Sequence, residues 1–209
     1  MLRSDHTENA PVDGEILHPG SRTLFRYWET IRAERPAPHR VDLDLGQIRA
    51  IVPDLFVLER DHVRQTFRFR LTGTRINQLH HKELTRADVL HGWDRFERDT
   101  LHRLLTTTVS TFQPCVVRMR LHSNMNHVIG VEMLCLPIVS RDDARMQIVG
   151  GLFPFREVAS LGYDRIVQQE LTGARTIWTE HAGGGLPVRP LAPAARRPLP
   201  FTVIQGGRD

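Results

Sequence analysis

Apolar and polar residues follow two different periods along the chain. Between residues 65 and 72, Phe67, Phe69 and Leu71 alternate with polar residues, which predicts a strand with one buried face. Between residues 94 and 112 the period is helical instead. The apolar stripe there consists of Leu101, Leu104, Leu105, Thr108 and Phe112. It predicts a long amphipathic helix that ends before Pro114.

The same periods, with proline, glycine and aspartate between them, place the other elements. In chain order we expect a helix at 21–35, a short helix at 45–51, strands at 55–59 and 65–72, short helices at 76–80 and 85–90, the long helix, and strands at 116–122, 127–139 and 146–155. Ser21 is the expected cap of the first helix. Hairpins at both ends joined by a helical crossover predict an α+β fold, a mainly antiparallel sheet with helices over one face.

The two ends of the chain differ from its middle. Residues 1–20 are polar and lack periodicity, so we expect a flexible leader before a domain at 21–157. Residues 158–180 form an extension whose pattern fits either a helix or an added strand. Residues 181–209 are rich in Gly, Pro and Arg, and we expect this tail to be disordered.

Composition narrows the class of protein. The chain has 209 residues, 40% of them hydrophobic, and no apolar run near the ~20 residues that cross a bilayer. It also has no signal-peptide core, so we expect a cytoplasmic protein without membrane contact. The formal charge of +4 raises Arg-mediated nucleic-acid binding as one alternative. The arginines are scattered among 24 acidic residues without a recognition motif, which argues against that alternative.

Five short segments carry a family resemblance. They are FRYWETIRAER at 25–35, residues 44–59, FRFRLTGT at 67–74, residues 82–85 and EMLCLP at 132–137. In their order and spacing the chain resembles a bacterial family of single-domain PAS-like proteins over residues 21–155. The resemblance implies a five-stranded sheet in the order 2-1-5-4-3, with the crossover enclosing a pocket. It also implies binding of a small molecule or haem, or dimerisation and signalling to a partner protein.

The chain departs from this family in the crossover. Arg86 stands where the resemblance leads us to expect a glycine, and His80 and His81 replace an expected aromatic residue and glycine. Both departures lie where a PAS pocket is usually lined. The class of ligand therefore stays open.

Strand and helix periodicity select the side chains that would line such a pocket. The candidates face one side of the sheet or the long helix above it. They are Phe67, Phe69, Leu71, Leu101, Leu104, Leu105, Val117, Met119, Leu121 and Met133. The alternative is that these side chains simply fill a core.

The two cysteines share the parity of the pocket-facing residues on neighbouring strands. A turn centred on Met125 would set Cys115 directly opposite Cys135. We hypothesise a close thiol pair that could act as a redox sensor. The alternative is that both are small buried hydrophobic residues.

From the sequence we expect a regulatory module that binds a signalling partner, with a homodimer formed through the first helix. Its apolar face carries Leu24, Phe25, Trp28 and Ile31. A haem or metal sensor is a further alternative, although the eleven histidines show no HExxH or zinc spacing. The cofactor stays unknown and no metal ligands are assigned. No nucleophile elbow, P-loop or acid/base pair is evident, so we expect no enzymatic activity.

Four arginines alternate with the buried residues of two strands. They are Arg68, Arg70, Arg118 and Arg120. By the resemblance both strands lie at the edges of the sheet. Charges there would discourage unwanted strand pairing or meet acidic groups on a partner.

Overall fold

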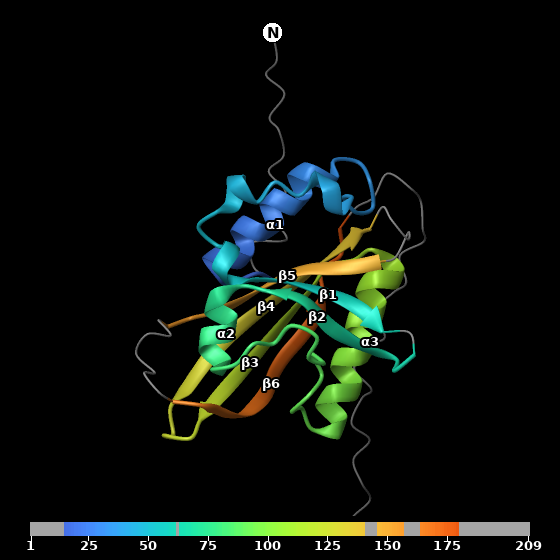
Figure 1. The fold of residues 1–209 in the computed structure, drawn as a ribbon. Coiled ribbons are helices and arrows are strands. Elements are labelled where there is room, and N and C mark those ends of the chain that lie inside the picture. The colour runs from blue at the N-terminus through green and yellow to red at the C-terminus, as the bar shows by residue number, and fades with distance from the viewer. Residues whose placement is uncertain (1–14, 62, 141–145, 157–163, 180–209) are drawn as a thin grey trace, which may run out of the picture.

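One antiparallel sheet forms the centre of the molecule (Figure 1). The computed structural model describes residues 15–61, 63–140, 146–156 and 164–179. The strands are β1 (Leu55–Asp61), β2 (Thr66–Thr72), β3 (Cys115–Ser123), β4 (Val128–Val139), β5 (Met146–Pro154) and β6 (Ile166–Thr176). They pair in the order β2-β1-β5-β4-β3-β6. The α+β fold and the order 2-1-5-4-3 are therefore confirmed, and a sixth strand is added beside β3.

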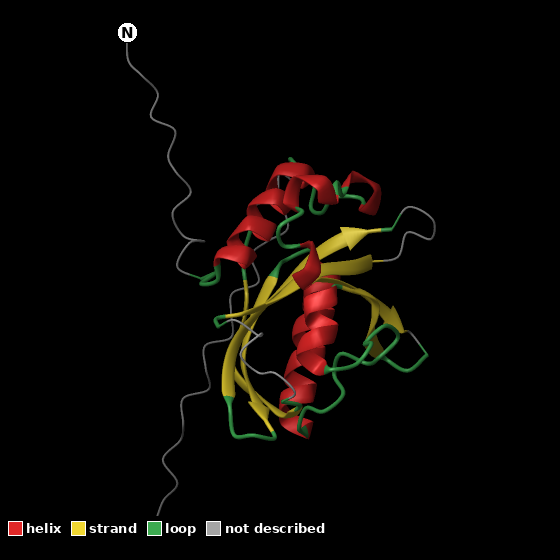
Figure 2. Ribbon diagram, turned by 60° about the vertical axis from the view of Figure 1, so that its left-hand side comes forward, coloured by secondary structure: helices red, strands yellow, loops and turns green. Residues whose placement is uncertain are grey.

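Helices cover both faces of the sheet. The sheet curls around α3 (Arg95–Thr111), while α1 (Pro19–Arg32) lies on the outer, opposite side (Figure 2). The inner face also carries α2 (Thr74–His80). Three short 3₁₀ helices connect α1 to β1: η1 (Arg40–Asp42), η2 (Leu45–Ile48) and η3 (Val52–Asp54). Each face of the sheet has its own cluster of buried hydrophobic side chains.

The long helix matches its sequence pattern closely. The side chain of Asp94 caps α3 by accepting a hydrogen bond from the backbone N–H of Glu97 at 2.8 Å. Leu101, Leu105 and Thr108 of the predicted stripe are buried against the inner face. The stripe therefore does what its spacing predicts, which is to hold the helix on the sheet.

The first helix begins earlier than its sequence indicates. His18 caps α1, and its ring Nδ1 accepts a hydrogen bond from the N–H of Gly20 at 3.0 Å. Pro19 occupies the first turn, and Ile16 before it is fully buried. The expected leader of residues 1–20 is thus too long, and Ser21 lies inside the helix. Residues 1–14 of that leader lie outside the described residues.

A buried carboxylate fixes the start of α1 to the sheet. Glu132 on β4 accepts hydrogen bonds from the N–H groups of Leu17 at 3.0 Å and His18 at 2.8 Å, and from Arg118 Nε at 3.2 Å. Burial raises the pKa of Glu132, but the hydrogen bonds from His18, Leu17 and Arg118 outweigh it and hold the pKa below its ordinary value. An ionised Glu132 therefore joins β3, β4 and α1.

The apolar face of α1 packs against the sheet of its own chain. Leu24, Phe25 and Trp28 are buried there, and Ile31 is partly buried in the same cluster. The Trp28 Nε1–H donates to the carbonyl of Pro137 on β4 at 2.8 Å. This corrects the expectation that these four side chains form an interface with a second copy.

The hairpin of β1 and β2 contains a register shift. It falls between Val57 and Leu58, so that Val57 pairs with Leu71 but Leu58 pairs with Phe69. The extra residue in β2 reverses the alternation. Leu71 consequently lies on the opposite face from Phe69 and is 52% exposed. The expectation that Leu71 faces a pocket is therefore wrong.

The crossover from α2 to α3 is less helical than its sequence suggests. Residues 85–90 form turns instead of the expected short helix. They run along the outer edge of β2, where Phe69 N–H donates to the Ala87 carbonyl at 3.0 Å and Val89 N–H donates to the Phe67 carbonyl at 3.0 Å. These hydrogen bonds to β2 replace those that a helix would make.

Both departures from the family resemblance lie at left-handed backbone positions. Arg86 has φ 71° and His81 has φ 50°, in the region that favours glycine. A glycine is the residue expected at each of them from the resemblance. The chain therefore adopts these turns at some conformational cost.

The C-terminal extension resolves into a strand. β6 pairs with β3 along its whole length, so β3 is an inner strand and only β2 of the two arginine-bearing strands lies at an edge. All four arginines pair with acidic residues of their own chain: Arg68 with Asp61, Arg70 with Glu59, Arg118 with Glu132 and Arg120 with Glu170. Residues 157–163 and the tail at 180–209 lie outside the described residues.

Candidate functional site

A cavity of about 250 Å³ lies between the inner face of the sheet and the elements that cover it. Its floor comes from β1, β2, β3, β4 and β5, and its walls come from α2, α3, the crossover and β6. The lining is largely apolar, with aromatic rings from Phe56, Phe69 and Trp93. A concave apolar cavity with a few polar groups is the usual form of a small-molecule site.

The structure brings together six of the ten predicted pocket residues. The side chains that line the cavity are Phe69, Leu101, Leu105, Met119, Leu121 and Met133. Phe67 and Val117 are buried in the adjoining core, Leu104 is partly buried there, and Leu71 is exposed. Whether the six residues contact a ligand is taken up below as a proposal.

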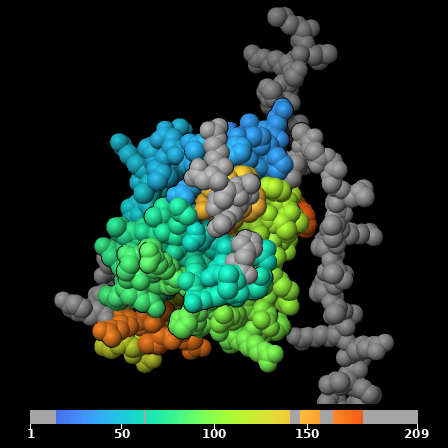
Figure 3. Space-filling model, turned by 45° about the vertical axis from the view of Figure 1, so that its right-hand side comes forward, coloured from blue at the N-terminus to red at the C-terminus, as the bar shows by residue number. Residues whose placement is uncertain are grey.

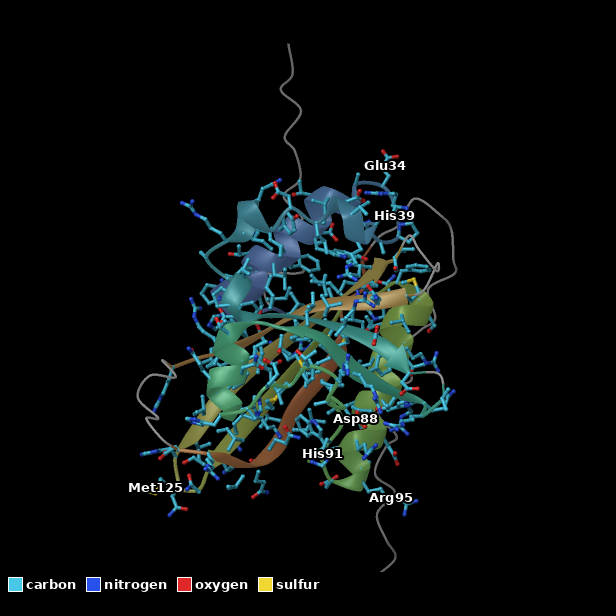
Figure 4. All side chains as sticks on the ribbon, viewed as in Figure 1. Glu34, His39, Asp88, His91, Arg95 and Met125 are labelled. Carbon is cyan, nitrogen blue, oxygen red and sulfur yellow. The ribbon has the colours of Figure 1, made fainter. Side chains whose placement is uncertain are left out.

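Sequence periodicity missed the polar residues that line the cavity. His80 and Lys82 line it from the end of α2, Asp88 and His91 from the crossover, and Gln168 and Gln169 from β6. Asp88 and His91 lie near the start of α3, which the label of Arg95 marks (Figure 4). One sequence signal was available: Lys82 is the only lysine in the chain.

The carboxylate of Asp88 is held by its own chain. It accepts hydrogen bonds from Thr66 Oγ1 at 2.6 Å and from the N–H of Leu90 at 2.8 Å. It also forms an ion pair with Arg98 of α3 at 3.2 Å. Asp88 therefore fixes the crossover to β2 and α3, and its charge is already balanced.

His80 is neutral at physiological pH. Burial lowers its pKa, and the positive charge of Lys82 lowers it further, to about 4. A neutral imidazole has one N–H donor and one acceptor nitrogen. No hydrogen bond to the His80 ring is present among the described residues, so both groups are available to whatever occupies the cavity.

The crossover and β6 meet to close one side of the cavity. In Figure 3 the green crossover and the orange β6 adjoin on one face of the molecule. Gln169 Nε2 donates to the His91 carbonyl at 2.9 Å, and the Leu171 N–H donates to Glu97 of α3 at 2.7 Å. These two polar contacts connect β6 to the elements around the cavity.

The cysteines are paired as their parity predicted. Cys115 on β3 lies directly opposite Cys135 on β4, and both are fully buried. The hydrogen bond that the Cys135 thiol donates to Cys115, together with burial, raises the pKa of Cys135. Because the thiolate is the form that reacts, this environment disfavours oxidation. The two thiols do not line the cavity, and the redox role stays a hypothesis.

Two features are missing from the described part of the chain. Within it, no three side chains of His, Cys, Asp or Glu gather closely enough to hold a metal ion. In the same residues, no helix combines the length and apolar character that a bilayer span requires.

Comparisons with known proteins identify the fold family. No protein of curated function matches the chain. Among solved structures, the chain is similar to the PAS domain from Bordetella pertussis BvgS, with 16% sequence identity and a TM-score of 0.39, over 56% of this chain and 90% of that one. The family model described as PAS domain matches residues 16–153, from the segment before α1 to β5. With two thirds of its length matched, the chain belongs to the PAS domain family.

Proposed function

We propose that the protein is a sensory or regulatory module in signal transduction whose cavity holds a small, mainly apolar molecule. The observation that carries this proposal is the cavity itself, a concave space of about 250 Å³ whose lining combines apolar and polar side chains. Its lining contains rings, flexible methionines and a few polar groups, which is the composition of ligand sites.

The signal would pass through the elements that touch both the cavity and the surface. The crossover and β6 line the cavity from one side and reach solvent on the other, as exposed His91 and Val167 show. A bound molecule that favours one arrangement of these segments shifts the population towards it. We propose that a protein partner, or a second copy of the chain, reads that arrangement. PAS domains commonly mediate such contacts.

Native mass spectrometry tests the proposal against a variant with a filled cavity. Ala87 lines the cavity from the crossover, so Ala87→Phe would occupy the space that a ligand needs. Ala50→Phe is the matched control, since Ala50 is exposed and does not line the cavity. Wild type and Ala50→Phe should carry an additional small-molecule mass that Ala87→Phe lacks. The same spectra report whether the protein is a homodimer.

Two results would contradict this proposal. A wild-type protein without bound mass, or equal bound mass in wild type and a folded Ala87→Phe variant, would show that the cavity holds nothing specific. An absorption band of haem in the purified protein would identify the haem alternative instead. Binding of nucleic acid that weakens steeply with salt would identify the Arg-mediated alternative.

A further inference from the structure

The lining of the cavity carries one positive charge that the described part of the chain does not pair with a carboxylate. Among the described residues, Lys82 forms no ion pair. The neighbouring carboxylate of Glu83 is occupied by Thr72, Asn77 and Thr85, with distances of 2.5–3.1 Å to their polar atoms. Asp88, the carboxylate among the described residues that line the cavity, is already paired with Arg98.

Beside this ammonium group lies a second free donor. The His80 imidazole lines the same side of the cavity and makes no hydrogen bond within the described chain. Because the pKa of His80 is about 4, the ring is neutral near pH 7 and donates one hydrogen bond. One charged and one neutral donor at the edge of an apolar space are a suitable pair for the two oxygens of a single carboxylate.

We propose that the ligand is a monocarboxylic acid with an apolar body, whose carboxylate binds Lys82 and His80 while its body lies among the leucines and methionines of the cavity. This inference rests on the proposed function, because it names the class of molecule that the cavity holds. The cavity of about 250 Å³ is near the lower end of ligand sites. It suits a chain on the order of ten carbon atoms or an aromatic acid of similar size.

Charge balance selects a monocarboxylate over other anions. A phosphate monoester carries about two negative charges at neutral pH, and Lys82 could balance only one of them. The second charge would share the cavity with the Asp88 carboxylate, and like charges repel each other. A neutral alcohol would fill the apolar space but leave the ammonium group of Lys82 without a counter-charge.

Decanoate and decanol separate these possibilities, since they share one chain length and differ in charge. Their dissociation constants would be measured by calorimetry, with fluorescence of the cavity residue Trp93 as a second readout. At about pH 7.5 the carboxylate is ionised. Wild type should bind decanoate about tenfold more tightly than decanol, although decanol is the more hydrophobic molecule. In Lys82→Met this preference should disappear.

Arg103→Met is the matched control. Arg103 is exposed on α3 and does not line the cavity, so its removal changes the net charge equally but should leave the tenfold preference intact. Equal binding of decanoate and decanol to wild type would overturn the carboxylate proposal, as would a preference that survives in Lys82→Met. Failure of both probes would overturn it as well. Native mass spectrometry of Ala87→Phe and its control tests separately whether the cavity holds any small molecule, which is the proposed function.

Discussion

Replacement of Glu132 by glutamine should destabilise the protein strongly. The substitution keeps the shape of the side chain but removes the charge that Leu17, His18 and Arg118 share. Hydrogen bonds to charged groups contribute about 1.5–3 kcal/mol each, and loss of one partner from a buried ion pair costs about 3–5 kcal/mol. Because the glutamine amide keeps one acceptor oxygen, we expect a loss of about 3 kcal/mol in the free energy of unfolding.

Chemical denaturation followed by circular dichroism measures this loss, and the fluorescence of buried Trp28 reports on α1 directly. At about 2–4 °C per kcal/mol for a chain of this length, the melting temperature should fall by about 6–12 °C. Glu170→Gln is the control, because Glu170 pairs with Arg120 and His122 at the surface. Exposed ion pairs contribute about 0–1 kcal/mol.

The pH dependence has a defined sign. The folded-state pKa of Glu132 lies below its ordinary value of 4.5, so its contribution is complete above that pH and is lost as the pH falls through the folded-state pKa. The difference in free energy of unfolding between wild type and Glu132→Gln should therefore decrease as the pH falls through the same range. If Glu132→Gln lies within about 1 kcal/mol of wild type at neutral pH, the carboxylate does not anchor α1 as argued above.

Three further predictions concern other positions. The pKa of His80 is about 4 in the folded state, against an ordinary value of 6.5. This difference corresponds to up to about 3 kcal/mol of stability, which is complete above pH 6.5 and is lost as the pH falls towards 4. Denaturation curves of His80→Gln across that range should lack this loss. Arg86→Gly should raise the free energy of unfolding by about 1 kcal/mol, because its left-handed backbone favours glycine, and an unchanged or lower value would contradict this. Cys115 and Cys135 should both react with a thiol reagent only after unfolding, whereas rapid oxidation by peroxide in the native state would support the redox hypothesis.

The elements with strong periodicity were predictable because one interaction determines each of them. The stripe on residues 94–112 fits a helix with one buried face, and α3 is found there. The parity of Cys115 and Cys135 needed only one turn position to set the pair opposite each other, and their register confirms it. In both cases short-range geometry was sufficient.

Predictions failed where a distant partner decides the structure. The register shift beside Leu58 turns Leu71 outward, and nothing in the alternation of β2 reveals it. Residues 85–90 form turns because the edge of β2 supplies their hydrogen bonds. The apolar face of α1, which we expected to contact a second copy, packs against the sheet of the same chain. Periodicity identifies a buried face, but it does not identify what buries it.

Two glycines of β5 also show that the sequence can reveal a packing constraint without revealing the residue that imposes it. Adjacent glycines such as Gly150 and Gly151 in a strand indicate a bulge or a close backbone approach, and a Cβ atom at Gly150 would collide with the Phe56 ring and the Leu134 carbonyl. The glycine was visible in the sequence, while the ring that needs its space lies almost a hundred residues away. Sequence alone therefore located the constraint but not its cause.

The position of β6 has a consequence for how selectivity could diversify. The part of the chain that the family model matches ends at residue 153, yet residues 166–169 of β6 form one wall of the cavity. The shared domain thus provides the floor, and a peripheral strand completes the enclosure. Under the proposed function, substitutions in that strand would change which molecules the cavity retains without disturbing the inherited scaffold, so proteins with the same core would respond to different chemical cues.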